Sequence, residues 1–140
     1  DGRGLLAALS LGAQAVQVGT RFVASKEAVV HEAYKNRLIS AKDIDTVVTG
    51  RSHGHPVRCL RNNMTREYAR LESEGKSFEE LEYLTLGALR KAVQEGDIVN
   101  GTVMAGQISG MIAQVQTCSE IIENMVAQAQ KLAGSAMQWF

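Results

Sequence analysis

The sequence is short of several residue types, and each shortage excludes a class of protein. Its 140 residues include one proline and two cysteines, Cys59 and Cys118. One proline excludes collagen-like and proline-rich architectures. Two cysteines are too few for a disulfide framework, so we interpret both as thiols. No run approaches the roughly 18 to 20 apolar residues that span a bilayer, and the first residues lack the layout of a signal peptide.

An excess of charge of one sign is also missing. Fifteen Lys and Arg residues balance fifteen Asp and Glu residues, without a long basic block. This balance argues against nucleic acid or an anionic membrane as a partner. We therefore expect neither as a partner. The lack of a membrane span and of a signal peptide leads us to expect a cytoplasmic protein. The 45% of hydrophobic and 21% of charged residues are ordinary for one globular unit with its own core.

Two glycine-bearing turns occur within the first twenty residues. The turn at 1–4 (DGRG) opens an apolar-periodic segment, which predicts a helix over about 2–11 that stops at Gly12. Residues 14–18 then predict a short buried strand, which ends at Gly19-Thr20. This arrangement can place two sets of backbone N–H groups on one side of a sheet, where they favour an anion such as phosphate.

Gly19 and Thr20 are the strongest candidates for a binding role. A strand that ends there would present two backbone N–H groups and the Thr20 hydroxyl at one point, with no side chain on Gly19 to block a phosphate. The alternative is a tight turn from strand to helix in which Thr20 serves as a cap. The residues alone leave both interpretations open.

The rest of the chain is predicted to be mostly helical. A short helical turn is expected over 20–24, and Ser25 can cap a helix of about 26–39. Residues 45–49 and 56–60 predict a small antiparallel hairpin across a turn from Gly50 to Gly54. Another helix is expected over about 63–74 and ends at Gly75. Ser77 and Glu80 form a capping box that predicts a helix as far as Gly96. A second capping box, Thr117 with Glu120, predicts a last helix through Leu132. The final AMQWF is left unassigned between a loose end and an extension of the last helix.

Three separated blocks resemble a known family in the same order and at similar spacing. They are DGRGLLAALSLGAQAVQVGTRFVASKEA, DIDTVVTGRSHGHPVRCLRNNMTREY and GDIVNGTVMAGQISGMI. Together they resemble the C-terminal part of the flavin-dependent enoyl-acyl-carrier-protein reductase II family, whose close relative is the nitronate monooxygenase (2-nitropropane dioxygenase) family. Nearly the whole chain is covered.

The resemblance implies an α/β fold, namely the C-terminal part of a TIM (β/α)8 barrel followed by a mostly helical region with a small β-hairpin. Residues 1–24 would be the last helix, strand and turn of the flavin-binding barrel, and residues 25–140 would be the helical region that packs on it. Such a barrel typically needs about 250 residues. We therefore expect the chain to be a segment of a longer enzyme.

The resemblance also implies site residues. Gly19 and Thr20 would bind the FMN phosphate together with a glycine turn upstream, and Gly2 would lie near that phosphate, whereas Gly4 would relieve helix–strand crowding. Arg21 could add positive charge there or face solvent. The segment Met104-Ala105-Gly106-Gln107 would fold over the barrel mouth, with Gly106 and Gln107 close to the cofactor. Its alternative role is a helix start with glycine-assisted packing.

The function that the resemblance implies is enoyl-acyl-carrier-protein reduction with FMN and NADH or NADPH, in fatty-acid synthesis. The substrate would be a small molecule or a thioester on acyl carrier protein, and the full-length enzyme a homo-oligomer. The catalytic histidine of the family lies upstream, so no catalytic residue is expected here and the isolated segment should be inactive. The alternatives are a nitronate monooxygenase that oxidises alkyl nitronates, and a noncatalytic helical interaction module.

The histidines at 53 and 55 raise the question of a metal. On an extended strand they would lie on one face, about 6.6 Å apart, but no third ligand has a suitable spacing. No metal site is expected, and His55 is interpreted as a packing or hydrogen-bonding residue near the rim of the site. Cys59 would be about 13 Å from His55 along a strand, which is too far for a nucleophilic pair.

Overall fold

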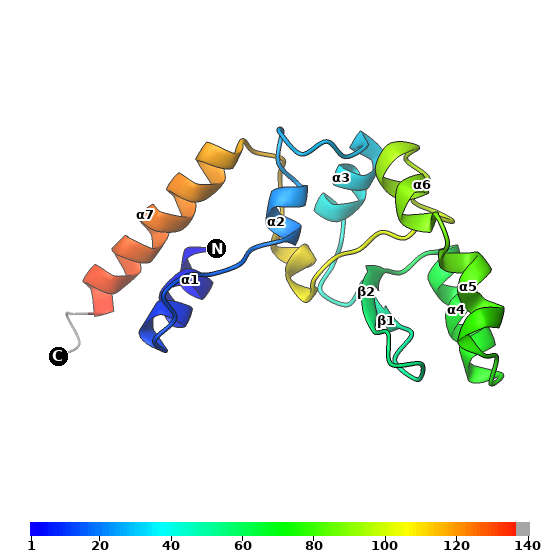
Figure 1. Cartoon of the computed structure of the whole chain (residues 1–140). Helices are drawn as coiled ribbons and strands as arrows, with labels where there is room; N and C mark the ends of the chain where they lie inside the picture. Colours follow the sequence, from blue (N-terminus) through cyan, green and yellow to red (C-terminus); the bar gives the residue numbers. More distant parts are fainter. Residues whose placement is uncertain (137–140) are drawn as a thin grey trace.

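The computed structural model describes residues 1–136, which form an arch of helices with one β-hairpin near one end (Figure 1). The elements are, in order, α1 (Gly2–Ser10), α2 (Thr20–Val23), α3 (Glu32–Ile39), β1 (Thr46–Thr49), β2 (Val57–Leu60), α4 (Asn63–Ser73), α5 (Phe78–Thr85), α6 (Ala88–Gln94), the 3-10 helix η1 (Gln107–Met111) and α7 (Cys118–Ala136). α1 and α7 lie side by side at one end, and the hairpin with α4 and α5 lies at the other. α2, α3 and η1 lie between them.

The hairpin forms as predicted. β1 and β2 pair antiparallel, with Thr46 opposite Leu60 and Thr49 opposite Val57. The turn between them needs two left-handed residues, and glycine supplies both, at Gly50 (φ 71°) and Gly54 (φ 76°). The β-branched residues on either side favour the extended strands.

Both predicted capping boxes are present. The amide of Glu80 donates to the Ser77 hydroxyl and the Ser77 amide to the Glu80 carboxylate, which starts α5. Thr117 and Glu120 make the same reciprocal pair, 3.1 and 2.7 Å long, at the start of α7. These bonds satisfy amides that a helix start leaves without partners.

Two of the predicted helices have wrong bounds. The helix expected from Ser77 to Gly96 is broken into α5 and α6 at Gly87, whose φ of 73° is left-handed and cannot continue a helix. The helix expected from residue 26 begins at Glu32, with His31 as its cap. Ser25 caps only a local turn, because the next amide, of Lys26, donates to the Gln116 carbonyl at 2.8 Å and ties this segment to the chain before α7.

The strand predicted over 14–18 was wrong for this structure. Residues 15–19 have no regular secondary structure, and Val16 is 38% exposed rather than buried. A parallel barrel strand takes its hydrogen bonds from the strands on either side, and the helices around the barrel cover its outer face. Among the described residues only β1 and β2 form a sheet, and they pair with each other.

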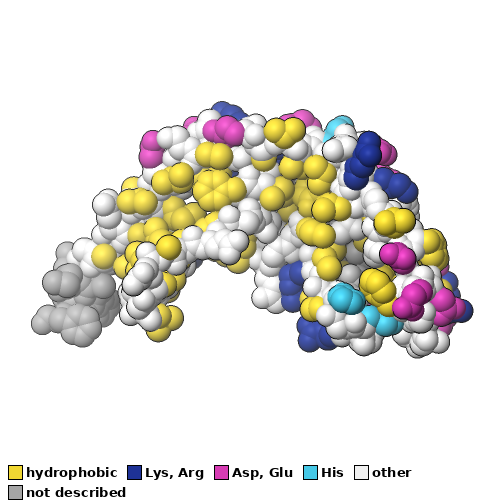
Figure 2. Space-filling model, in the orientation of Figure 1, with side chains coloured by type: hydrophobic (Ala, Val, Ile, Leu, Met, Phe, Trp, Pro, Cys, Tyr) yellow, Lys and Arg dark blue, Asp and Glu magenta, His cyan; other side chains and the backbone are white. Residues whose placement is uncertain are grey.

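The main core lies in the middle of the arch. Leu38 of α3, Leu60 of β2, Ala92 of α6 and Val103 meet there. A second cluster, of Met64, Tyr68 and Leu81, lies between α4 and α5. Hydrophobic side chains also show on the surface between the two ends, where the molecule is hollowed (Figure 2). No helix within residues 1–136 is long and apolar enough to cross a membrane. The C-terminal Met137, Gln138, Trp139 and Phe140 lie outside the described residues.

Candidate functional site

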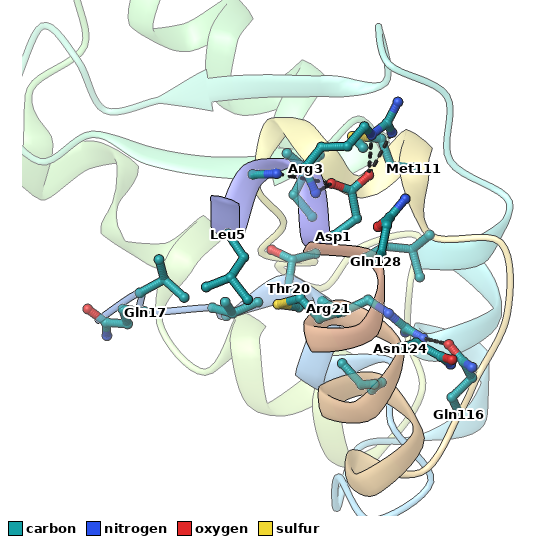
Figure 3. A pocket seen from close by; sticks show the side chains of 18 residues that line it. Asp1, Arg3, Leu5, Gln17, Thr20, Arg21, Met111, Gln116, Asn124 and Gln128 are labelled. Atoms are coloured by element: carbon teal, nitrogen blue, oxygen red, sulfur yellow. Dashed lines mark hydrogen bonds and ion pairs between the residues drawn. The ribbon is translucent and has the colours of Figure 1, made fainter. Parts of the chain in front are cut away.

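A cavity of about 670 Å³ opens between the α1–α7 end of the arch and its middle, where α2 and η1 lie. Its walls come from α1, the segment 16–21, η1 and the first half of α7 (Figure 3). Apolar side chains dominate the lining, with a smaller set of amides and two arginines. The lining residues include Leu5, Val16, Val18, Gly19, Thr20, Arg21, Ile108, Met111, Gln116, Ile121, Asn124 and Gln128. An apolar cavity with a few polar groups is the usual form of a small-molecule site.

Gly19 and Thr20 lie at one corner of this cavity, which we call the 19–20 corner. The amides of Gly19, Thr20 and Arg21 donate to no acceptor among the described residues, as expected at the start of a helix. A side chain on Gly19 would meet nothing within 4 Å there. The corner therefore has free donors and open space, the two features that a bound phosphate requires.

The Thr20 side chain does not cap α2, which was the alternative interpretation. The residue before α2 is Gly19, and no side chain bonds to the first amides. Instead the Thr20 hydroxyl oxygen accepts a 2.8 Å hydrogen bond from the amide of Gly106, 86 positions later. The hydroxyl proton finds no acceptor among the described residues and is free to donate to a ligand.

The segment 104–107, which we call the 104–107 turn, therefore lies against the 19–20 corner. A Cβ on Gly106 would lie 3.3 Å from the Thr20 hydroxyl, so this glycine permits the close approach. The two motifs that the sequence singled out separately are thus brought together. Gln107 is exposed and does not line the cavity. It begins η1, so the helix start proposed as the alternative is also present.

The glycines of the first turn have roles different from those expected. Gly2 does not line the cavity: it packs under α7, and its amide donates to the Gln128 side chain at 2.8 Å. Gly4, expected to relieve crowding, lines the cavity and has nothing within 4 Å of its Cβ position. The packing role therefore belongs to Gly2, because α7 crosses α1 at that point.

Asp1 and Arg3 are engaged with each other. The Asp1 carboxylate accepts from the amides of Arg3 and Gly4, at 3.0 and 3.2 Å, and caps α1. It also pairs with the Arg3 guanidinium at 2.6 Å (Figure 3). The Asp1 carboxylate thus already compensates the partial positive charge at the start of α1.

Arg21 lines the cavity but turns away from the corner. Its guanidinium donates to the Gln114 carbonyl at 3.2 Å and to the Gln116 side chain beside Asn124 (Figure 3). Partial burial lowers the pKa of the Arg21 guanidinium from its usual value. That value is so high that the group remains charged at neutral pH. Arg21 thus contributes charge to the cavity while it holds the segment before α7.

The two histidines pack on α5 instead of forming a site. The rings of His53 and His55 lie 6.3 and 4.9 Å from the ring of Phe78. His53 Nε2 lies 3.0 Å from the Lys76 carbonyl. The hairpin turn lies at the far end of the arch from α1 and α7 (Figure 1). Within residues 1–136, no group of three or more His, Cys, Asp or Glu side chains could hold a metal ion.

Sequence reasoning missed Tyr34, which the structure places behind the 104–107 turn. Its side chain is 2% exposed, and its hydroxyl donates to the Met104 carbonyl at 2.7 Å. Beside it lies Cys59, whose burial raises the pKa of the thiol to about 11. The available signal was an aromatic residue among the polar residues of α3, a pattern that indicates one buried position.

Comparison with known proteins places this geometry in a family. A family model described as nitronate monooxygenase matches residues 1–128. The chain belongs to the nitronate monooxygenase family. A probable nitronate monooxygenase of Staphylococcus saprophyticus is 33% identical over 132 residues, which are 94% of this chain and 37% of that protein. A probable nitronate monooxygenase of Staphylococcus aureus strain MSSA476 is 30% identical, again over 94% of this chain and 37% of that protein.

Two solved structures match all or nearly all of the chain. FabK from Thermotoga maritima superposes with a TM-score of 0.94 and 41% identity, over 100% of this chain and 44% of that one. A nitroalkane oxidase from Streptomyces ansochromogenes matches with a TM-score of 0.74 and 25% identity, over 96% of this chain and 38% of that one. Both neighbours are TIM-barrel enzymes, which confirms the expected fold class: the C-terminal part of a barrel, then a mostly helical region with a hairpin. The chain spans less than half the length of these relatives.

Proposed function

We propose that this chain is the C-terminal part of a longer FMN-dependent oxidoreductase and supplies part of its FMN phosphate site. Residues 1–24 would complete the barrel, and residues 25–140 would form the helical region that packs on it. The observation that supports this most directly is the 19–20 corner, with its free amides and its hydrogen bond to the 104–107 turn. The catalytic residues would come from the upstream part of the enzyme.

The residues of the corner fit a phosphate. The amides of Gly19 and Thr20 and the Thr20 hydroxyl proton would donate to phosphate oxygens, while Gly106 would keep the turn close to the hydroxyl. Gly2 would lie near this phosphate without donating its amide, which is bonded to Gln128. Gln107, exposed at the start of η1, is free to contact the rest of the cofactor. When bound, FMN would supply the redox chemistry by accepting a hydride and passing it on.

The preferred reaction is the reduction of an enoyl thioester on acyl carrier protein, with NADH or NADPH as reductant, in fatty-acid synthesis. FabK from Thermotoga maritima supports this choice, because it matches at higher identity and TM-score than the nitroalkane oxidase does. That match covers the whole chain, so it includes the hairpin and α4 to α6.

The second candidate is nitronate monooxygenase activity. The family model and the Staphylococcus relatives favour it by their descriptions. In this reaction the same cofactor would oxidise an alkyl nitronate with oxygen. The two candidates share the flavin site and differ in the substrate that meets it, so the 19–20 corner does not discriminate between them.

The experiment uses the full-length gene product that carries this chain. It should be purified yellow, and acid-released cofactor should co-elute with FMN in chromatography. NAD(P)H oxidation that crotonyl thioester accelerates, and that exceeds the rate of nitronate oxidation, supports the reductase. Faster oxygen uptake with an alkyl nitronate in the absence of NAD(P)H supports the monooxygenase. Colourless protein that cannot be reconstituted with FMN contradicts both and favours the noncatalytic interaction module.

Two further expectations accompany this proposal. The full-length enzyme should be a homo-oligomer, which light scattering coupled to gel filtration would measure. Its compartment should be the cytoplasm, and both cysteines of the chain are free, as is usual there.

A further inference from the structure

The 104–107 turn is held from three sides. The Tyr34 hydroxyl donates to the Met104 carbonyl at 2.7 Å, the Ala105 amide donates to the Arg58 carbonyl at 3.2 Å, and the Gly106 amide donates to the Thr20 hydroxyl oxygen at 2.8 Å. The holders belong to α3, β2 and α2. The turn therefore joins the helical region to the 19–20 corner.

The bond from Tyr34 is the side-chain bond that joins the turn to α3. Among the described residues, the Met104 carbonyl accepts from the Tyr34 hydroxyl alone. Cys59 lies opposite Met104 as an antiparallel pair, but the backbone bonds on either side of this pair join Leu60 to Val103 and Ala105 to Arg58. Without the hydroxyl, the carbonyl would lose its partner in the core.

The Tyr34 hydroxyl keeps its proton and can always donate this hydrogen bond. Tyr34 is 2% exposed, and burial, with the neighbouring Cys59 as a smaller cause, raises the pKa of Tyr34 to about 12. The phenol stays protonated throughout the range in which the enzyme would work. Because a hydrogen bond is stronger in a buried environment than in water, the bond from the Tyr34 hydroxyl fixes the turn more firmly than an exposed contact would.

We propose that Tyr34 is a positioning residue for the flavin corner, which sets the place of the Gly106 amide and, through it, the orientation of the Thr20 hydroxyl. This inference rests on the proposed function. Tyr34 itself does not line the cavity and would not touch the cofactor. It acts through the backbone of the 104–107 turn. Tyr34 holds the Met104 carbonyl, and two residues later the Gly106 amide holds the Thr20 hydroxyl, which would meet the phosphate.

The test compares Tyr34→Phe with Tyr68→Phe in the full-length protein. Tyr68 is a matched control because it is also buried, 3% exposed, and its hydroxyl has no hydrogen-bond partner among the described residues. FMN is removed and titrated back, and the dissociation constant is read from the flavin fluorescence. The loss of one hydrogen bond predicts about a three- to tenfold weaker FMN affinity for Tyr34→Phe, and less than about a twofold change for Tyr68→Phe.

Two further readouts separate positioning from stability. In Tyr34→Phe, the amides of Ala105 and Gly106 should exchange with deuterium faster than in wild type, while those of α4 should not. Tyr34→4-aminophenylalanine keeps a donor and should restore the affinity, whereas Tyr34→4-fluorophenylalanine, which fills the same space without a donor, should not. This pair replaces Tyr34→Phe if that variant does not fold.

The outcomes are distinct. Equal FMN affinity of the donor and non-donor variants at position 34 overturns the positioning role while the proposed function stands. A lower melting temperature with unchanged FMN affinity has the same meaning, because a merely structural tyrosine would behave so. A wild-type protein that binds no FMN refutes the proposed function itself, and with it this inference.

Discussion

Replacing Gly2 with alanine should separate α1 from α7, because the added carbon has no room. It would lie 2.5 Å from the Met125 carbonyl oxygen, 2.6 Å from the Ala129 amide nitrogen and 2.7 Å from Cβ of Gln128. Two of these atoms are α7 backbone, so no change of rotamer relieves the clash. Since carbon contacts are favourable only at about 3.5 Å, the helices must move apart by about 1 Å.

The magnitude follows from the same geometry. Overpacking of this kind costs about 1–3 kcal/mol. A longer bond from the Gly2 amide to Gln128, now 2.8 Å, adds up to about 1 kcal/mol. The better helix propensity of alanine offsets less than about 1 kcal/mol. We therefore expect Gly2→Ala to lower the free energy of unfolding by about 1–3 kcal/mol.

The assay is urea unfolding of the full-length protein, followed by far-ultraviolet circular dichroism. Gly4→Ala is the matched control, because it lies in the same helix and has nothing within 4 Å of its Cβ position. The control should be neutral or stabilising by up to about 1 kcal/mol. A urea midpoint for Gly2→Ala equal to or above that of Gly4→Ala would refute the close packing of α1 on α7.

Further predictions concern the corner, the start of α7, the break at Gly87 and the thiols. Thr20→Val should weaken FMN binding about ten- to a hundredfold in a fluorescence titration, and Thr20→Ser by less than about threefold. The Cys118 amide donates to Glu27 and lowers the pKa of that carboxyl. This stabilisation is present above the usual glutamate pKa of about 4.3 and is lost as the pH falls. Melting temperatures of Glu27→Gln should thus fall less steeply than those of wild type between about pH 5 and 3. Gly87→Ala should cost about 1–2 kcal/mol in thermal unfolding, because φ there is 73°. Peptide mapping after thiol labelling should find Cys118 modified before Cys59, which is buried and has its pKa raised to about 11.

Local chemistry made some elements predictable. Capping boxes and turn glycines determine the backbone only within a few residues of their own position. The box of Ser77 and Glu80 and the glycines at 50 and 54 therefore lie where the sequence predicts them. The break at Gly87 was missed because the apolar spacing continues across it: periodicity reports which side is buried, not whether the backbone stays helical. The segment 14–18 needs partner strands that the described chain does not contain, so its pattern describes the barrel rather than this structure.

The site was predictable in its motifs but not in its connections. Resemblance singled out Gly19, Thr20 and Gly106, and the structure brings them together. The exchange of roles between Gly2 and Gly4 depends on where α7 crosses α1, and no local signal encodes a crossing point. Tyr34 was missed for the same reason, because its partner, the Met104 carbonyl, is a backbone atom 70 positions away.

The 86 positions between Thr20 and Gly106 also impose an order on synthesis. Until Gly106 has left the ribosome, the Thr20 hydroxyl lacks the amide that it accepts from in the folded chain. The proposed phosphate corner can therefore form only after the segment that joins its two parts has been synthesised. Ribosome-bound chains that stop short of Met104 should thus bind FMN more weakly than those that extend past α7.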